Sequence, residues 1–223
     1  MEPIWHEVDK YFSAQLIPHD AALDAALAAS DAAALPAIQV TAAQGKFLNL
    51  LAQMCGARRI LEIGTLGGYS TIWMARALPH GGELISLEID ERHATLAREN
   101  LSRAGLQDRV TVLTAPALDS LATLAAQHVA PFDLVFIDAD KANIPAYFEA
   151  SLGLSRIGTV IVVDNVVREG KVTNADSSDK DIQGVRRLAA LLVDDKRVSA
   201  TALQTVGSKG YDGFIIARVV ATG

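Results

Sequence analysis

The sequence predicts an α/β protein built on a doubly wound, mostly parallel sheet of seven strands, with N-terminal helices and a C-terminal antiparallel hairpin. Through the middle of the chain, short apolar runs alternate with helical segments of about 10 to 15 residues, as βαβ units require. These runs are almost wholly apolar, which is typical of strands covered on both faces. The last two apolar runs are separated only by a short turn, which predicts the hairpin.

Residues 1–55 are expected to form a helical segment that shapes the site. Apolar residues recur at helical spacing from Ile4 to Phe12, and residues 19–35 are rich in alanine. A third helix is expected over residues 41–56, with Thr41 as its N-cap and Gly56 at its end.

The remaining chain is expected to form the α/β core. Five strands are predicted at residues 58–64, 83–90, 109–115, 132–138 and 158–165. Helices are predicted at residues 68–81, 91–105, 117–129 and 142–155, the first ended by Pro79 and Gly81 and the last beginning near Pro145.

The tail of the chain differs from the alternating region. A polar loop at 166–181 and a helix at 182–195 lead to strands at 197–207 and 211–220, which we expect to pair at the sheet edge. No linker, repeat or low-complexity tract interrupts the sequence. We therefore predict one domain over residues 1–223, in which residues 56–223 form the α/β core.

Composition bounds the function. The net charge is −6, so the sequence lacks the basic balance of nucleic-acid-binding proteins, and no nucleic-acid partner is expected. No stretch reaches the roughly 18 to 20 apolar residues of a membrane helix, and charges interrupt the first residues, unlike a signal peptide. The single cysteine, Cys55, excludes an internal disulfide and favours a cytoplasmic setting.

A glycine-rich turn follows the first predicted strand. Gly64, Gly67 and Gly68 lie between a strand and a helix, where backbone N–H groups can approach a ligand. Their spacing is not G-x-G-x-x-G, and Glu62 within the strand end is also unlike that fingerprint. The next strand ends on Glu88, whose carboxylate can accept both hydroxyls of an unphosphorylated ribose. A nucleoside ligand is predicted, so residues 56–223 are expected to be a nucleotide-binding core, and S-adenosylmethionine and NAD both fit.

Two further predicted strands end in acids, Asp138 and Asp164, and Asn165 follows the second. The carboxyl ends of parallel strands meet at one edge, about 5 Å apart if the strands are neighbours. Two carboxylates and an amide oxygen suit a small hard cation, Mg²⁺ first, with Mn²⁺ or Ca²⁺ as alternatives. The five histidines lack ligand spacing, so zinc is not expected and they are assigned to the surface or to caps.

Lys141 lies three residues after Asp138, so one helical turn can aim both side chains at the same spot. A lysine beside such a site can serve as a general base. The alternative is an ordinary surface pair between Lys141 and Asp138. Asp140 is expected to be structural and to cap the helix that follows.

Four blocks, "LEIGTLGGYS", "SLEID", "FIDADK" and "VVDN", resemble in order and spacing the cation-dependent, S-adenosylmethionine-dependent O-methyltransferases of the catechol and caffeoyl-CoA type. The resemblance covers about residues 35–220 and points to a bacterial member. It implies a class I methyltransferase fold, which is Rossmann-like, and a homodimer. It also implies S-adenosylmethionine as methyl donor, Mg²⁺ as cation and a small aromatic molecule with vicinal hydroxyls as acceptor.

The resemblance also assigns residues. It implies metal ligation by Asp138, Asp164 and Asn165, and catalysis by Lys141 as base with Asp138. The implied cofactor contacts are Val40, Glu62, Gly64, Thr65, Ser70, Glu88, Ile89, Ala117 and Asp138. Among them Glu88 would take the ribose, Ile89 would pack on adenine, and Ser70 with the backbone near Gly64 would hold the methionine end. The chain departs from some relatives at Ile38, where they carry methionine, and at Leu66, where they carry tyrosine.

The expected reaction is methyl transfer to a catechol-like acceptor. The diol chelates the cation, Lys141 takes a hydroxyl proton, and the phenolate attacks the sulfonium methyl in line. The helical N-terminus and the loop 168–181 are expected to shape the acceptor pocket.

Three other interpretations stay open. An NAD-linked oxidoreductase would use Glu88 and the glycine turn but would leave Asp138, Asp164 and Asn165 idle. Methylation of a hydroxylated RNA base would use the same site, although the acidic charge and the absence of an Asn-Pro-Pro-type motif disfavour it. A non-catalytic binding module is disfavoured because the four charged or amide residues at the strand ends are intact.

Overall fold

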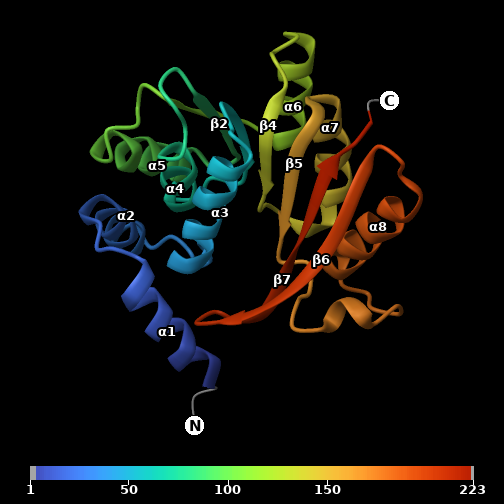
Figure 1. Ribbon diagram of the computed structural model, residues 1–223, viewed down its shortest axis with the longest axis horizontal. Coiled ribbons are helices and arrows are strands. Elements are labelled where there is room, and N and C mark those ends of the chain that lie inside the picture. Colours follow the sequence, from blue (N-terminus) through green and yellow to red (C-terminus); the bar gives the residue numbers. More distant parts are fainter. Residues whose placement is uncertain (1–3, 222–223) are drawn as a thin grey trace.

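Seven strands form one mixed sheet in the computed structural model, which describes residues 4–221 (Figure 1). The strand order is β3-β2-β1-β4-β5-β7-β6, with β1 to β5 parallel and β7 antiparallel to both its neighbours. The strands are β1 (Arg59–Ile63), β2 (Glu83–Glu88), β3 (Val110–Thr114), β4 (Phe132–Ile137), β5 (Ser155–Asp164), β6 (Val198–Gly207) and β7 (Gly210–Val219). The predicted sheet, including its C-terminal hairpin, is confirmed.

Helices cover both faces of this sheet (Figure 1). They are α1 (Ile4–Leu16), α2 (Ala21–Ala32), α3 (Ala42–Met54), α4 (Tyr69–Ala75), α5 (Glu91–Arg103), α6 (Ala117–Ala126), α7 (Ile144–Gly153) and α8 (Lys180–Asp194), with 3₁₀ turns η1 (Lys141–Asn143) and η2 (Lys171–Thr173). One core cluster joins the sheet to α2, α3, α4 and α5, and the other joins it to α6, α7 and α8. None of the described helices is long and apolar enough to cross a membrane.

The central strand β4 shows why the apolar runs are continuous. All six of its residues are buried. Leu134 and Phe136 belong to one core cluster, whereas Val135 and Ile137 belong to the other. Because successive side chains of a strand point to opposite faces, a strand covered on both sides needs an apolar residue at nearly every position.

The N-terminal helices differ in how firmly they join the core. Thr41 caps α3 by accepting a hydrogen bond from the Gln44 backbone N–H at 3.1 Å, as predicted. Leu48 of α3 and Leu23 of α2 are buried in the same cluster as the sheet residues. In contrast, α1 buries none of its residues.

Several element boundaries differ from the prediction, and the end of α4 differs most. Helix α4 ends at Ala75, before Pro79, because Ala77 and Leu78 donate to carbonyls three residues back, which tightens the chain into a 3₁₀ turn. The residue before a proline also disfavours helix. Strand β5 begins at Ser155 rather than at Gly158, which lies within the strand in the left-handed region, with φ of 98°.

Candidate active site

A cleft of about 450 Å³ opens at the carboxyl ends of the parallel strands, where β1 lies between β2 and β4. The chain continues from β1 to β2 on one side and reaches β4 on the other, so this is the point at which strand order reverses. Crevices at such points are the usual ligand sites of doubly wound sheets. The volume lies in the range of small-molecule pockets.

The first strand end touches the fourth directly. A Cβ on Gly64 would collide with the carbonyl oxygen of Asp138, and Gly64 has φ of 102°. The Asp138 backbone N–H donates to the Ile63 carbonyl at 2.8 Å. Glycine is therefore required where the turn after β1 passes the strand that carries Asp138.

Asp138 and Lys141 form a close pair beside the cleft. Lys141 Nζ donates to Asp138 Oδ1 at 2.8 Å, and the two side chains are 6% and 21% exposed. Both residues line the cleft. The alternative of an ordinary surface pair is wrong, because the lysine is buried among residues of the site.

The turn that carries Lys141 is held from two sides. On one side, a Cβ on Gly184 of α8 would collide with the Lys141 carbonyl, and Arg187 donates to the Ala142 carbonyl at 2.9 Å. On the other side, the carboxylate of Asp140 accepts from Tyr147 at 2.5 Å and from Asn143 at 2.7 Å. The expected backbone cap by Asp140 is wrong: its two oxygens are engaged by these side chains instead.

Asp164 and Asn165 lie next to this pair. Strands β4 and β5 are neighbours with Ile137 opposite Val163, so Asp138 and Asp164 follow at equivalent positions. Asp164 is 4% exposed and accepts from Gln44 Nε2 at 2.6 Å and from the Asn165 backbone at 2.8 Å. Burial, and then the charge of Asp138, raise the pKa of Asp164 to about 7.

This donor set fits a divalent cation. Asn165 lines the cleft, and within residues 4–221 its side chain makes no hydrogen bond, so its amide oxygen is available. Two carboxylates beside an amide oxygen are the hard ligands that Mg²⁺ or Mn²⁺ prefers. No group of three or more His, Cys, Asp or Glu suited to a metal occurs in the described part of the chain, so a cation here would need Asn165 and other oxygen ligands.

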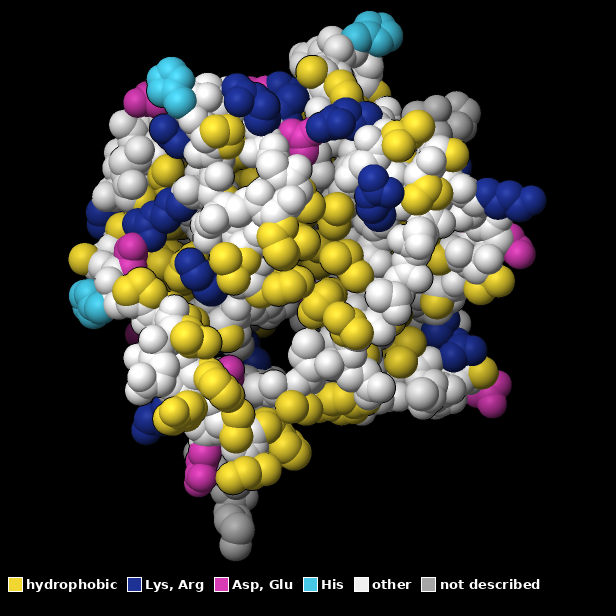
Figure 2. Space-filling model, viewed as in Figure 1, with side chains coloured by type: hydrophobic (Ala, Val, Ile, Leu, Met, Phe, Trp, Pro, Cys, Tyr) yellow, Lys and Arg dark blue, Asp and Glu magenta, His cyan; other side chains and the backbone are white. Residues whose placement is uncertain are grey.

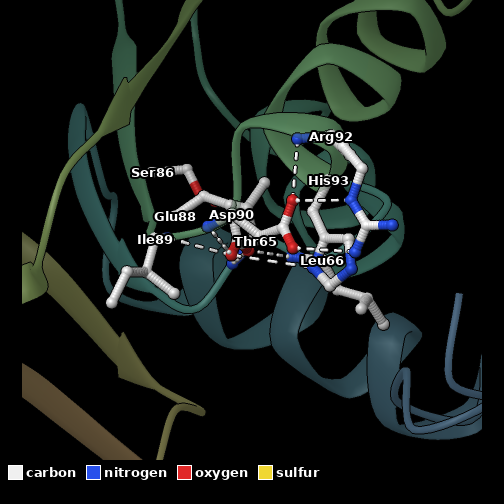
Figure 3. Close-up of polar contacts among 8 residues, drawn as sticks. All are labelled: Thr65, Leu66, Ser86, Glu88, Ile89, Asp90, Arg92 and His93. Atoms are coloured by element: carbon white, nitrogen blue, oxygen red, sulfur yellow. Dashed lines mark hydrogen bonds and ion pairs between the residues drawn. The ribbon is translucent and has the colours of Figure 1, made fainter.

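The turn after β1 and the end of β2 meet at Glu88 (Figure 3). Glu88 Oε2 accepts from the backbone N–H groups of Thr65 at 3.3 Å and Leu66 at 2.7 Å. Glu88 Oε1 accepts from those of Ile89 at 2.9 Å and Asp90 at 3.0 Å. Four backbone donors thus fix an 8% exposed carboxylate at the edge of the cleft.

Glu62 lies beneath this turn rather than on the cleft. It is fully buried and accepts hydroxyl hydrogen bonds from Ser70 and Thr71 at 2.5 Å and from Ser86 at 2.6 Å. Burial raises the pKa of Glu62 to about 7, against the opposing effect of these three donors. Glu62 therefore does not line the cleft, but it contacts Ser70, which does.

The structure brings the other residues assigned to the cofactor together. Those that line the cleft are Val40, Gly64, Thr65, Ser70, Glu88, Ile89, Ala117 and Asp138. Ile89 is 71% exposed at the rim, whereas Val40 is buried.

Several cleft residues were not anticipated from the sequence. Tyr147, Arg168, Asp181 and His93 all line the cleft, although His93 was assigned to the surface or a cap. The loop 168–181, expected to shape the acceptor pocket, supplies two of them. Gln44 was also missed, because no local signal marks a residue whose partner lies far along the chain.

Comparison with known proteins decides the family. The chain matches the family model described as O-methyltransferase over residues 15–219. The chain belongs to the O-methyltransferase family. The resemblance carried by the four sequence blocks is thereby confirmed.

This O-methyltransferase is similar to curated proteins along nearly its full length. It is 51% identical over 216 residues to a catechol O-methyltransferase of Niastella koreensis, covering 97% of this chain and 98% of the relative. It is 54% identical over 213 residues to a catechol O-methyltransferase of Mycobacterium tuberculosis, covering 96% and 95%.

Solved structures similar to this chain are also O-methyltransferases. An O-methyltransferase from Bacillus cereus in complex with SAH (S-adenosylhomocysteine) is 59% identical with a TM-score of 0.96, covering 97% of this chain and 98% of that one. TomG from Streptomyces achromogenes, in complex with SAM, is 50% identical with a TM-score of 0.96, covering 99% and 100%. The protein is an S-adenosylmethionine-dependent O-methyltransferase with the class I fold, and the interpretation as an NAD-linked oxidoreductase is wrong.

Proposed function

We propose that this protein methylates one hydroxyl of a small aromatic molecule with two adjacent hydroxyls, with the aid of a divalent cation bound by Asp138, Asp164 and Asn165. The observation that carries the proposal is the juxtaposition of these three oxygen donors with the buried Lys141 at adjacent strand ends. Asp138, Asn165 and Lys141 line the cleft, and Asp164 is buried next to them. The name catechol O-methyltransferase borne by two relatives supports the acceptor class.

In this proposal the chain's own residues divide the work. Lys141 takes the proton of the reacting hydroxyl, and Asp138 orients the amine through the 2.8 Å hydrogen bond. Gln44 and the Asn165 backbone N–H hold the carboxylate of Asp164 in place. When bound, Mg²⁺ would supply Lewis-acid polarisation of the hydroxyl and a template for both acceptor oxygens.

The same proposal assigns the cofactor end. Glu88 accepts the ribose hydroxyls, Ile89 covers the adenine at the rim, and Ser70 with the backbone at Gly64 and Thr65 meets the methionine end. Val40 and Ala117 complete the walls, and Asp138 borders both ligands. Glu62 acts indirectly, since it orients the hydroxyl of Ser70. S-adenosylmethionine supplies the methyl group.

The test is methyl transfer from S-adenosylmethionine to a catechol panel, with Mg²⁺ and with EDTA. We expect Asp164→Asn to abolish the Mg²⁺-dependent rate while S-adenosylhomocysteine binding, measured by calorimetry, stays within about threefold. Asp119→Asn, which removes an exposed carboxylate on α6, is the matched control and is expected to keep full activity. An Asp164→Asn enzyme with wild-type activity would contradict the metal assignment.

Methylation of a hydroxylated RNA base remains a second candidate for the same site. It is tested by adding structured RNA to the same assay. Methyl incorporation into RNA, combined with no turnover of any catechol, would overturn the proposed acceptor class.

We also propose that the protein is a homodimer that associates through α1. This helix has no buried residue, and Ile4, Val8, Tyr11, Phe12 and Leu16 are 47–67% exposed. Figure 2 shows apolar side chains gathered on α1 and across the middle of the same face. We expect light scattering to give twice the monomer mass, and Val8→Glu with Phe12→Glu to give the monomer.

Two coarser expectations complete the proposal. Residues 1–223 are proposed to fold as one domain, because buried residues of α2 and α3 share a core cluster with the sheet. Limited proteolysis should leave residues of α3 attached to the core. A cytoplasmic location remains our prediction from the single cysteine.

A further inference from the structure

We propose that Arg168 is a specificity-determining residue that binds a carboxylate on the acceptor, so that acidic catechols are the preferred substrates. The inference rests on the proposed catechol acceptor and names its chemical class. It concerns a residue of the loop after β5 that plays no part in the cation site or the cofactor contacts.

Arg168 lies at the acceptor end of the cleft. It follows Asn165 by three residues and lines the cleft together with Lys141, Tyr147 and Asp181. The residues assigned to the cofactor come mainly from the ends of β1 and β2, whereas Arg168 comes from the segment that follows β5. In the proposed binding mode the ring is held by its hydroxyls beside Asn165, and Arg168 borders the same space, where it can meet another substituent of the ring.

The guanidinium of Arg168 has hydrogen-bonding capacity to spare. Within residues 4–221 its side chain makes no hydrogen bond, and its ion pair with Asp181 spans 3.7 Å, with the two side chains 33% and 40% exposed. Partly exposed pairs of this kind contribute little. In contrast, Arg186 donates to the Val172 carbonyl at 2.7 Å and Arg187 to the Ala142 carbonyl at 2.9 Å.

The backbone at Arg168 is held in a conformation that costs energy. Its φ is 55°, in the left-handed region that residues with a Cβ avoid. Asp212 Oδ1 stabilises this turn by accepting from the backbone N–H groups of Val167 at 3.0 Å and Arg168 at 2.9 Å. Glu169 shares this left-handed conformation, with φ of 57°, but does not line the cleft. The hydrogen bonds to Asp212 therefore fix the backbone turn from which the side chain of Arg168 reaches the cleft.

The neighbouring acids leave the arginine free to bind an anion. Both oxygens of Asp140 already accept hydrogen bonds, from Tyr147 and Asn143. Asp181 is held to Arg168 only by the long ion pair. A carboxylate on the ring can displace Asp181 by forming two parallel hydrogen bonds with the planar guanidinium, which a neutral or cationic substituent cannot do.

The test compares three catechols: protocatechuate, which carries a carboxylate, its neutral methyl ester, and dihydroxybenzylamine, which carries a cation. For the wild-type enzyme we expect kcat/KM in the order acid, ester, amine. In Arg168→Gln the ratio of acid to ester should fall about tenfold to a hundredfold, while ester turnover stays within about threefold. For each enzyme, kcat/KM for the acid is divided by kcat/KM for the ester. Comparing these ratios between wild type and variant cancels the different intrinsic reactivity of the two acceptors.

Two controls and one binding measurement complete the design. Lys171→Gln removes the same charge from the same loop at an exposed residue paired with Glu169, and is expected to keep the wild-type ratio. Arg168→Lys keeps the charge without the planar fork and should give an intermediate ratio. Calorimetry with S-adenosylhomocysteine present measures the Kd of each enzyme for the acid and for the ester. The ratio of these Kd values should change in Arg168→Gln by the same factor as the ratio of kcat/KM values.

The outcomes separate the two levels of the account. Turnover of both acceptors with an unchanged ratio in Arg168→Gln, or a wild-type preference for the amine, would overturn the role of Arg168 and leave the proposed function standing. If Arg168→Gln loses all activity, an Arg168→Lys ratio equal to wild type would overturn the role. Turnover of no catechol by the wild-type enzyme would overturn the proposed acceptor class and this inference with it.

Discussion

Replacing Glu62 by glutamine should remove a large pH dependence from the stability of the ligand-free protein. The carboxyl is fully buried, and its pKa is raised from 4.5 to about 7 because burial disfavours the charged form. Glutamine has nearly the same shape, keeps one carbonyl acceptor for the surrounding hydroxyls, and has no ionisable proton.

The sign follows from where the proton is held. Below pH 4.5 the carboxyl is protonated in both folded and unfolded chains, so its full stabilising contribution is present. As pH rises toward about 7, the unfolded chain releases the proton while the folded one retains it, and that contribution is lost. A displacement from 4.5 to about 7 corresponds to on the order of 3 kcal/mol.

Urea unfolding of metal-free and cofactor-free protein at several pH values between 4 and 8 is the assay. The free energy of unfolding of the wild type, minus that of Glu62→Gln, should fall across this range by on the order of 3 kcal/mol. Glu99→Gln, an exposed glutamate on α5, provides the control and should give a flat difference. A flat difference for Glu62→Gln as well would refute the reasoning that burial governs this carboxyl.

Three further perturbations test other parts of the account. Gly184→Ala places a Cβ against the Lys141 carbonyl and should lower kcat at least tenfold. The Kd for S-adenosylhomocysteine, measured by calorimetry, should stay unchanged. An unchanged kcat would show that the turn carrying Lys141 tolerates displacement. Glu88→Gln should weaken S-adenosylhomocysteine binding about tenfold to a hundredfold, because an amide replaces a charged acceptor, and equal affinity would exclude its ribose role. Asp133→Asn should lower the free energy of unfolding by roughly 1 to 3 kcal/mol in urea titration. The reason is that the carboxylate accepts hydrogen bonds from the backbone N–H groups of Arg58 and Arg59 and from the side chain of Arg156. A decrease of less than about 0.5 kcal/mol would mean that these hydrogen bonds contribute little to stability.

The sheet and the cluster at its edge were accessible from the sequence for a physical reason. Strands covered on both faces must be apolar throughout, so β4 and β5 stand out, and any charge at their ends becomes visible by contrast. Parallel strands place those ends at one edge, which brings Asp138 and Asp164 together without any knowledge of side-chain positions.

What the sequence could not show depends on tertiary contact. The hydrogen bond from Gln44 to Asp164 joins the first turn of α3 to the end of β5, and no periodicity or motif marks it. The burial of Glu62 beneath the glycine turn is likewise a property of packing. The early end of α4 depends on backbone bonds that tighten into a 3₁₀ turn, which a helical pattern continuing to Pro79 conceals.

The position of Arg168 shows the same limit from another side. The sequence predicts that the loop 168–181 shapes the acceptor pocket, but it marks no single residue of the loop for that role. In the fold, Asp212 of β7 accepts hydrogen bonds from the backbone N–H groups of Val167 and Arg168, and Arg168 lines the cleft. These hydrogen bonds join the first residues of β7 to the loop after β5. Only the folded chain brings the two together.

The most direct test of the central claim is the rate of methyl transfer from S-adenosylmethionine to catechol by wild-type enzyme in excess EDTA, followed by titration with Mg²⁺. The claim is that Asp138, Asp164 and Asn165 bind a cation that the reaction needs. We expect no transfer above background in EDTA and full recovery of the rate as Mg²⁺ exceeds the chelator. Full activity in EDTA would contradict it.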